Sequence, residues 1–149
     1  MSRYVFMIAI TFGVRARAQT DTAARHAAAT TTTLSGVYTS DQASRGQDVY
    51  AGSCRGCHTP ASHTGDTFAK YWLHKSVADL FTYTGTYMPK NDPGSLDLHD
   101  VADVVAYLLK MNQMPAGPTE LLPDTTALRQ IRIEAKSSPA PSTTTGKSP

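Results

Sequence analysis

The chain holds two cysteines, Cys54 and Cys57, in the stretch CRGCHTP, and His58 follows the second of them directly. Two thiols and an imidazole within five residues can serve three kinds of chemistry: a disulfide, part of a zinc site, or covalent attachment of a cofactor. The choice depends on the loop that a disulfide would close, on the supply of further ligands, and on the elements around the motif.

The first two kinds of chemistry fit poorly. A disulfide between Cys54 and Cys57 would close a very small loop and would restrict the unfolded chain little. A thioredoxin-like redox pair follows a strand, whereas the residues before Cys54 have helical periodicity. A zinc site needs four ligands, usually from two close pairs, and no second Cys or His pair stands at a suitable spacing.

The pattern C-x-x-C-H is typical of c-type haem attachment. The two thiols add to the two vinyl groups of haem, and the histidine is placed to bind the iron. We therefore predict one covalently attached haem c, with its iron, at Cys54 and Cys57, and His58 as an iron ligand.

The second axial position of such an iron separates electron transfer from ligand binding and catalysis. Met88 is the favoured candidate because it lies in an irregular loop before Pro89, which stiffens the backbone. Most methionines are core residues, and we expect the histidines outside the motif to be solvated surface residues, although a second histidine ligand stays open. The competing candidates are Met111, Met114, His63, His74 and His99.

Three helical segments are expected to position these residues. The first covers residues 41–54, carries Gly46 and Tyr50 on one stripe, and has Ser40 or Asp41 as its cap.

The second segment starts at Ser76 and is expected to fray at Gly85. The third starts at Leu98 behind the cap Asp97, ends before Pro115, and has the clearest apolar face: Val101, Val104, Val105, Leu108 and Leu109. No paired strands or repeats are evident, so we predict an all-α fold.

The 149 residues leave room for one domain between segments of biased composition. A basic start, an apolar run and the sequence Ala-Arg-Ala predict a secretory signal peptide over residues 1–18. Residues 19–36, rich in Ala and Thr, and residues 137–149, rich in Ser, Thr and Pro, are expected to be flexible. Between them we expect a haem domain at 37–117 and an extension at 118–136, which either wraps the domain or docks a partner.

Without the three arginines of the predicted signal peptide, 14 − 3 = 11 basic residues remain against 12 acidic ones, so the mature chain has no basic excess of the kind that binds nucleic acid. The N-terminal apolar run is shorter than the roughly 20 residues that a membrane helix needs, and no later stretch is more apolar, so we expect no membrane span in the mature chain. Haem attachment of this kind takes place outside the bacterial cytoplasm. We therefore expect an exported, soluble protein of the periplasm.

Three pieces of the sequence together resemble class I c-type cytochromes: CRGCH, TYMP and HDVADVVAYLLKMN. More narrowly, residues 87–117 are similar to the end of single-haem bacterial cytochromes c and of the haem domains associated with periplasmic quinoprotein dehydrogenases. The resemblance covers residues 38–117. It implies the cytochrome c fold, thioether bonds at Cys54 and Cys57, and His58 and Met88 as the axial ligands.

The resemblance also implies contacts around the haem. In that family a glycine and an aromatic residue before the first cysteine pack against an aromatic residue of the last helix, and Gly46, Tyr50 and Tyr107 match this pattern. Trp72 or Tyr71 either bonds a haem propionate or packs at the haem edge.

The function implied is that of an electron carrier and not an enzyme. It would pass one electron at a time between periplasmic redox proteins, such as a dehydrogenase donor and a terminal oxidase or other cytochrome acceptor. The alternatives are a haem enzyme or a gas or peroxide sensor with a labile sixth ligand, and an electron-transfer subunit of a dehydrogenase complex.

Overall fold

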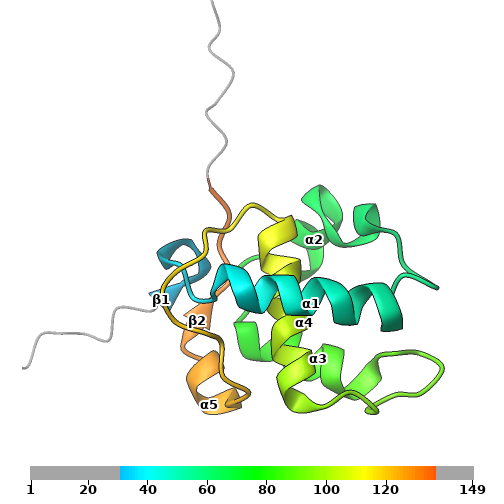
Figure 1. Cartoon of the computed structure of the whole chain (residues 1–149). Coiled ribbons are helices and arrows are strands. Elements are labelled where there is room, and N and C mark those ends of the chain that lie inside the picture. Colours follow the sequence, from blue (N-terminus) through cyan, green and yellow to red (C-terminus); the bar gives the residue numbers. More distant parts are fainter. Residues whose placement is uncertain (1–30, 137–149) are drawn as a thin grey trace, which may run out of the picture.

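The computed structural model describes residues 31–136, which are mostly helical (Figure 1). The signal peptide predicted at 1–18 and the tail predicted at 137–149 lie outside these residues. The elements in chain order are β1 (Thr31–Thr32), η2 (Thr33–Ser35), α1 (Ser40–Ser53), η3 (Pro60–His63), α2 (Gly65–Trp72), α3 (Val77–Tyr87), α4 (Leu98–Met111), α5 (Thr125–Leu128) and β2 (Ile131–Arg132), where η marks a 3-10 helix. The predicted all-α class is confirmed, with one two-stranded pair added.

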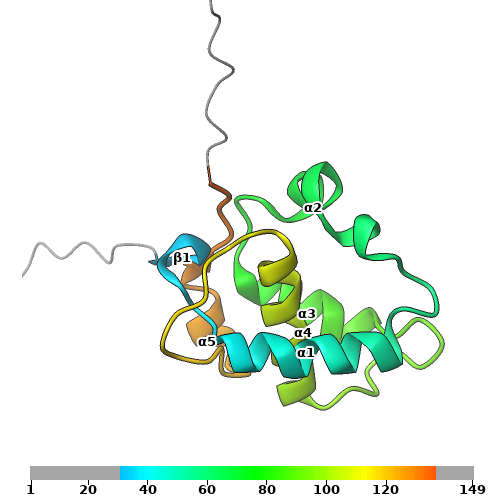
Figure 2. The ribbon, with the colours of Figure 1, turned by 45° about the horizontal axis from the view of Figure 1, so that its top comes forward.

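Helices α1 and α4 cross at the centre of the fold, as both ribbon views show (Figures 1 and 2). Gly46 allows the close approach, because a Cβ there would overlap the backbone carbonyl of Asp103. One turn later, the rings of Tyr50 and Tyr107 pack with their centroids 5.4 Å apart. The expected packing of a glycine and an aromatic residue against the last helix is therefore present.

The predicted cap of α1, Ser40 or Asp41, is wrong by one or two positions. The side chain of Thr39, not of Ser40 or Asp41, accepts the hydrogen bond from the backbone N–H of Gln42. The cap at Asp97 is confirmed, since its carboxylate accepts a hydrogen bond of 2.8 Å from the backbone N–H of His99.

Helix α3 differs from its prediction at one end. It begins behind Ser76, which forms a capping box with Asp79. It continues past Gly85 to Tyr87 instead of fraying there. The Cβ position of Gly85 would lie 3.5 Å from a methyl group of Val101, so packing on α4 supports the last turn.

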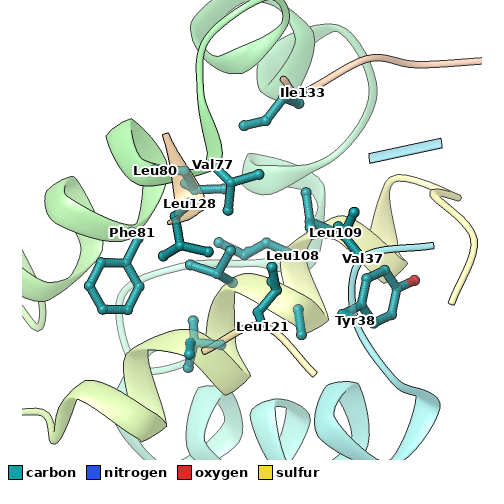
Figure 3. Packing of buried hydrophobic residues seen from close by; sticks show 14 of the residues in the cluster. Val37, Tyr38, Val77, Leu80, Phe81, Leu108, Leu109, Leu121, Leu128 and Ile133 are labelled. Carbon is teal, nitrogen blue, oxygen red and sulfur yellow. The ribbon is translucent and has the colours of Figure 1, made fainter. Parts of the chain in front are cut away.

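Residues 118–136 wrap the domain and supply part of its core. Leu121, Leu128 and Ile133 are almost fully buried and pack with residues of α3 and α4 (Figure 3). The buried side chain of Gln42 pairs with the backbone of Leu121 in both directions, each hydrogen bond being 2.8 Å long. Because these contacts join the extension to α1, it is an integral part of the fold.

The N-terminal end of the described chain is also folded. Thr31 and Thr32 pair in parallel with Ile131 and Arg132, and Figure 1 shows β1 beside β2. Thr33 is fully buried, and its hydroxyl exchanges hydrogen bonds of 2.9 and 3.0 Å with the backbone of Glu134. The flexible segment predicted over 19–36 is therefore too long, because Thr31, Thr32 and Thr33 at its end belong to the folded domain. No helix between residues 31 and 136 has both the length and the apolar character to cross a bilayer.

Candidate functional site

A cavity of about 520 Å³ opens between the end of α1, η3, α2, α3 and the loop after α3. Its volume falls within the usual range of cofactor sites. Its wall is mainly apolar and aromatic, with Phe68, Leu80, Val104 and Leu108 among the lining residues. All four residues nominated from the sequence line this one cavity: Cys54, Cys57, His58 and Met88.

The thiol motif forms a tight turn where α1 ends. The backbone N–H groups of Cys57 and His58 both donate to the carbonyl of Cys54, at 3.1 and 3.0 Å. Both thiols are free; Cys54 is half-buried and Cys57 is exposed. Burial raises the pKa of the Cys54 thiol, which opposes the thiolate that a reactive redox cysteine uses. The turn thus presents two thiols and an imidazole at one end of the cavity.

Met88 is the one methionine of residues 31–136 that lines the cavity. It follows the last residue of α3, and its backbone N–H donates to the carbonyl of Thr84 at 3.2 Å. Met114 is 4% exposed and belongs to the core, where its carbonyl accepts a hydrogen bond of 2.6 Å from the hydroxyl of Tyr38. Met111 packs against the core as well. The structure therefore separates Met88 from both competing methionines.

The histidines divide differently from the expectation. His74 and His99 are exposed, as predicted. His63 is not a solvated surface residue: it is half-buried in the cavity wall, with its ring centroid 4.6 Å from that of His58. Burial, together with the neighbouring His58, lowers the pKa of His63. The available signal was Pro60, which starts the 3-10 helix that turns the chain back toward the thiol motif.

Another part of the cavity wall is built by α2 and α3. The rings of Trp72 and Tyr83 pack with centroids 5.4 Å apart, and the Lys75 ammonium lies 5.1 Å from the centroid of Trp72. The extension supports this wall, because the backbone N–H of Ile133 donates to the carbonyl of Lys75 at 2.8 Å. Tyr71 and Trp72, left as alternatives by the sequence, both line the cavity.

The cavity wall contains the buried hydroxyl of Tyr50. Tyr50 is 2% exposed, and within residues 31–136 its hydroxyl has no hydrogen-bond partner. Buried polar groups in native proteins are normally paired. An unpaired hydroxyl beside a cavity therefore fits a wall that a bound group completes. No cluster of three or more His, Cys, Asp or Glu side chains in this part of the chain is placed to hold a metal ion.

Part of the chain matches a protein-family model. Residues 41–108 match the family model described as cytochrome C oxidase, cbb3-type, subunit III. The matched stretch starts in α1 and ends in α4, so it contains the thiol motif, Met88 and every residue that lines the cavity. No curated protein and no solved structure gives a match.

A domain of the matched kind carries a covalently bound haem c with its iron, and the cavity fits that group. Two free thiols are available for attachment, an imidazole and a thioether are available as ligands, and the wall is apolar. The hydroxyl of Tyr50 adds a buried polar group that has no hydrogen-bond partner within residues 31–136.

Proposed function

We propose, since residues 41–108 form a class I c-type cytochrome domain, that this chain is an electron carrier and not an enzyme. In this proposal Cys54 and Cys57 hold the haem through thioether bonds, and His58 and Met88 bind its iron. The haem supplies a one-electron couple between ferrous and ferric iron.

The observation that carries the proposal is the shared cavity. His58 and Met88 belong to segments far apart in the sequence, yet both line it together with the two thiols. One ligand follows the end of α1 and the other follows the end of α3, and both helices pack on α4. Because α4 ties the two segments together, the ligands are held by a rigid frame that need not rearrange when the charge of the site changes.

The chain's own residues favour the reduced state of the site. A thioether ligand raises the reduction potential of a haem relative to harder ligands. An apolar wall, here with Phe68, Leu80 and Val104, disfavours the extra positive charge of the oxidised state. A carrier with a high potential is suited to accept electrons from a dehydrogenase.

We further propose that the protein acts in the periplasm. Its donor would be a dehydrogenase, and its acceptor a terminal oxidase or another cytochrome. The proposal is supported by the matched family model, whose description is that of an oxidase subunit, and by the signal peptide expected at residues 1–18.

Absorbance spectra of the purified holoprotein test the ligand assignment. The ferric protein should show the weak long-wavelength band of sulfur bound to iron. Met88→Leu should abolish this band and lower the reduction potential, because it removes the thioether without changing the size of the side chain much. Met111→Leu is the matched control, since Met111 is partly buried outside the cavity, and it should leave both readouts unchanged.

Other outcomes point elsewhere. A band that survives Met88→Leu shows that another group binds the iron. A wild-type protein that lacks the band and readily binds carbon monoxide in the ferrous state is a sensor or an enzyme with an open position, and not a simple carrier.

A further inference from the structure

We propose that the ammonium group of Lys75 pairs with a carboxylate of the haem, and that the extension holds Lys75 in place for this contact. The inference rests on the proposed attachment of the haem at Cys54 and Cys57. It gives a role to a lysine of the cavity wall and to residues 131–134, which lie outside the matched stretch 41–108. Lys75 is then a cofactor-binding residue, and the extension acts through it.

The cavity wall offers cations but no anions to a bound group. Lys75 and Lys90 line the cavity, whereas its lining within residues 31–136 has no Asp or Glu. Haem has two carboxylates, and an anion in a mainly apolar cavity needs a partner of opposite charge. An ammonium group supplies that partner through a charge-assisted hydrogen bond. The charge of the wall therefore complements the charge of the haem.

The ammonium of Lys75 has a defined place in this wall. It lies 5.1 Å from the ring centroid of Trp72, which also lines the cavity. No ion pair of the described residues involves Lys75. The neighbouring carboxylate of Asp79 is engaged in the capping box, where it accepts hydrogen bonds of 3.0 and 2.8 Å from the backbone N–H and the hydroxyl of Ser76. The charge of Lys75 is therefore available to a bound carboxylate.

The extension fixes the backbone at His74 and Lys75. The backbone N–H of His74 donates to the carbonyl of Ile133 at 2.9 Å, and the N–H of Ile133 donates to the carbonyl of Lys75 at 2.8 Å. The guanidinium of Arg132 donates to the carbonyl of His74 at 2.8 Å.

These hydrogen bonds hold an unfavourable turn. His74 has a φ of 66°, in the left-handed region that costs free energy for a residue other than glycine. Ile133 is fully buried, so the segment that grips the turn is itself fixed in the core. The extension therefore sets the direction in which the side chain of Lys75 leaves the backbone.

Substitutions at Lys75 separate its charge from its packing. Lys75→Met removes the charge and keeps a long side chain, whereas Lys75→Arg keeps the charge. Without the cation a haem carboxylate is uncompensated, and its negative charge favours the ferric state. We expect Lys75→Met to lower the ferrous-to-ferric ratio at fixed poise by roughly threefold and Lys75→Arg to stay near wild type. Lys70→Met is the matched control, because Lys70 is an exposed lysine of α2 outside the cavity lining.

Infrared difference spectra between the oxidised and reduced holoprotein observe the pairing directly. With an isotope label in the haem carboxylates, their stretching bands should shift in Lys75→Met and keep the wild-type position in Lys70→Met. Unchanged bands in Lys75→Met overturn the inference, because a lysine that acts only through packing or distant charge leaves the carboxylates unaltered. Equal ferrous-to-ferric ratios in Lys75→Met and Lys70→Met overturn it as well.

A double-mutant cycle tests the part assigned to the extension. Arg132→Ala removes the donor to the carbonyl of His74. It should lower the ferrous-to-ferric ratio of the wild type but add nothing in Lys75→Met. Arg129→Ala, which removes another exposed arginine of the extension, should change little in either background. Full additivity of Arg132→Ala and Lys75→Met would show that the extension does not act through Lys75.

Failure of this inference differs from failure of the proposed function. If the sulfur band survives in all variants, negative results refute the role of Lys75 alone. If acidified organic solvent extracts the haem from the wild type, the attachment at Cys54 and Cys57 itself fails.

Discussion

Gly46 and Asp103 lie in direct backbone contact where α1 crosses α4, with no room between them for a single methyl group. Gly46→Ala should therefore push the helices apart. We expect a loss of about 3 kcal/mol in the free energy of unfolding of the holoprotein, measured by urea denaturation.

Gly52 provides the matched control on the same helix. A Cβ at Gly52 would meet nothing within 4 Å. Gly52→Ala should stabilise the protein by about 0.5 to 1 kcal/mol, because alanine loses less backbone entropy than glycine in a helix. Equal effects of the two substitutions would show that the helix crossing does not depend on Gly46.

The extension offers a matched pair of leucines. Leu128 is 2% exposed and Leu122 is 65% exposed. Leu128→Ala should cost about 2 to 5 kcal/mol by opening a cavity in the core, whereas Leu122→Ala should change stability by at most about 0.5 kcal/mol. Thermal unfolding followed by circular dichroism measures both. A Leu128→Ala protein as stable as wild type would mean that the extension is not part of the core.

The capping box of α3 makes stability depend on pH. Hydrogen bonds from the side chain and the backbone of Ser76 hold the pKa of Asp79 below its usual value of 3.8. Since the folded-state pKa is the lower one, ionised Asp79 stabilises the fold above pH 4 or so, and this contribution disappears as the pH falls through the folded-state pKa. Asp79→Asn should therefore destabilise the protein at neutral pH and have a smaller effect near pH 3.

Ser76→Ala tests the other half of the box. It removes the hydroxyl that accepts from the backbone N–H of Asp79, and loss of such a cap costs about 1 kcal/mol. Urea denaturation at both pH values compares the two variants. An effect of Asp79→Asn that is as large in acid as at neutral pH would exclude an ionised carboxylate as the stabilising group.

The two thiols should contribute separately to haem retention. Cys54→Ser or Cys57→Ser leaves one thioether bond, and the alkaline pyridine spectrum of each variant should shift toward that of haem with one free vinyl group. With both cysteines replaced, the haem should be extracted by acidified organic solvent. Extraction from wild type under the same conditions would contradict covalent attachment.

Local signals predicted α1 and α4, and they nominated four residues that line one cavity. Asp97 and the apolar stripe of α4 lie within one short stretch of sequence, and so do the residues of the thiol motif. Each pattern can therefore be recognised locally. The cap of α1 was misplaced because Thr39, Ser40 and Asp41 are three successive residues that can all cap a helix, and only the backbone geometry distinguishes them.

The remaining features depend on contacts between distant residues. The half-buried position of His63 depends on Asn112, the residue that follows α4 much later in the chain. The extension lacks helical periodicity, and its attachment uses a side chain of α1, Gln42, as a substitute for a backbone partner. Such contacts cannot be predicted from residue spacing, because the sequence around either residue does not indicate which distant residue it will contact.

The parallel pairing of β1 with β2 brings the entrance and the exit of the described chain to one corner of the molecule. In both ribbon views this corner lies at the start of α1, and the thiol motif follows its far end (Figures 1 and 2). The 14 residues of α1 span about 21 Å. Both ends of the described chain therefore lie on one side of the domain. A domain of this kind tolerates fusion at either end or insertion into a loop of another protein. The thiol motif would then lie away from the junction.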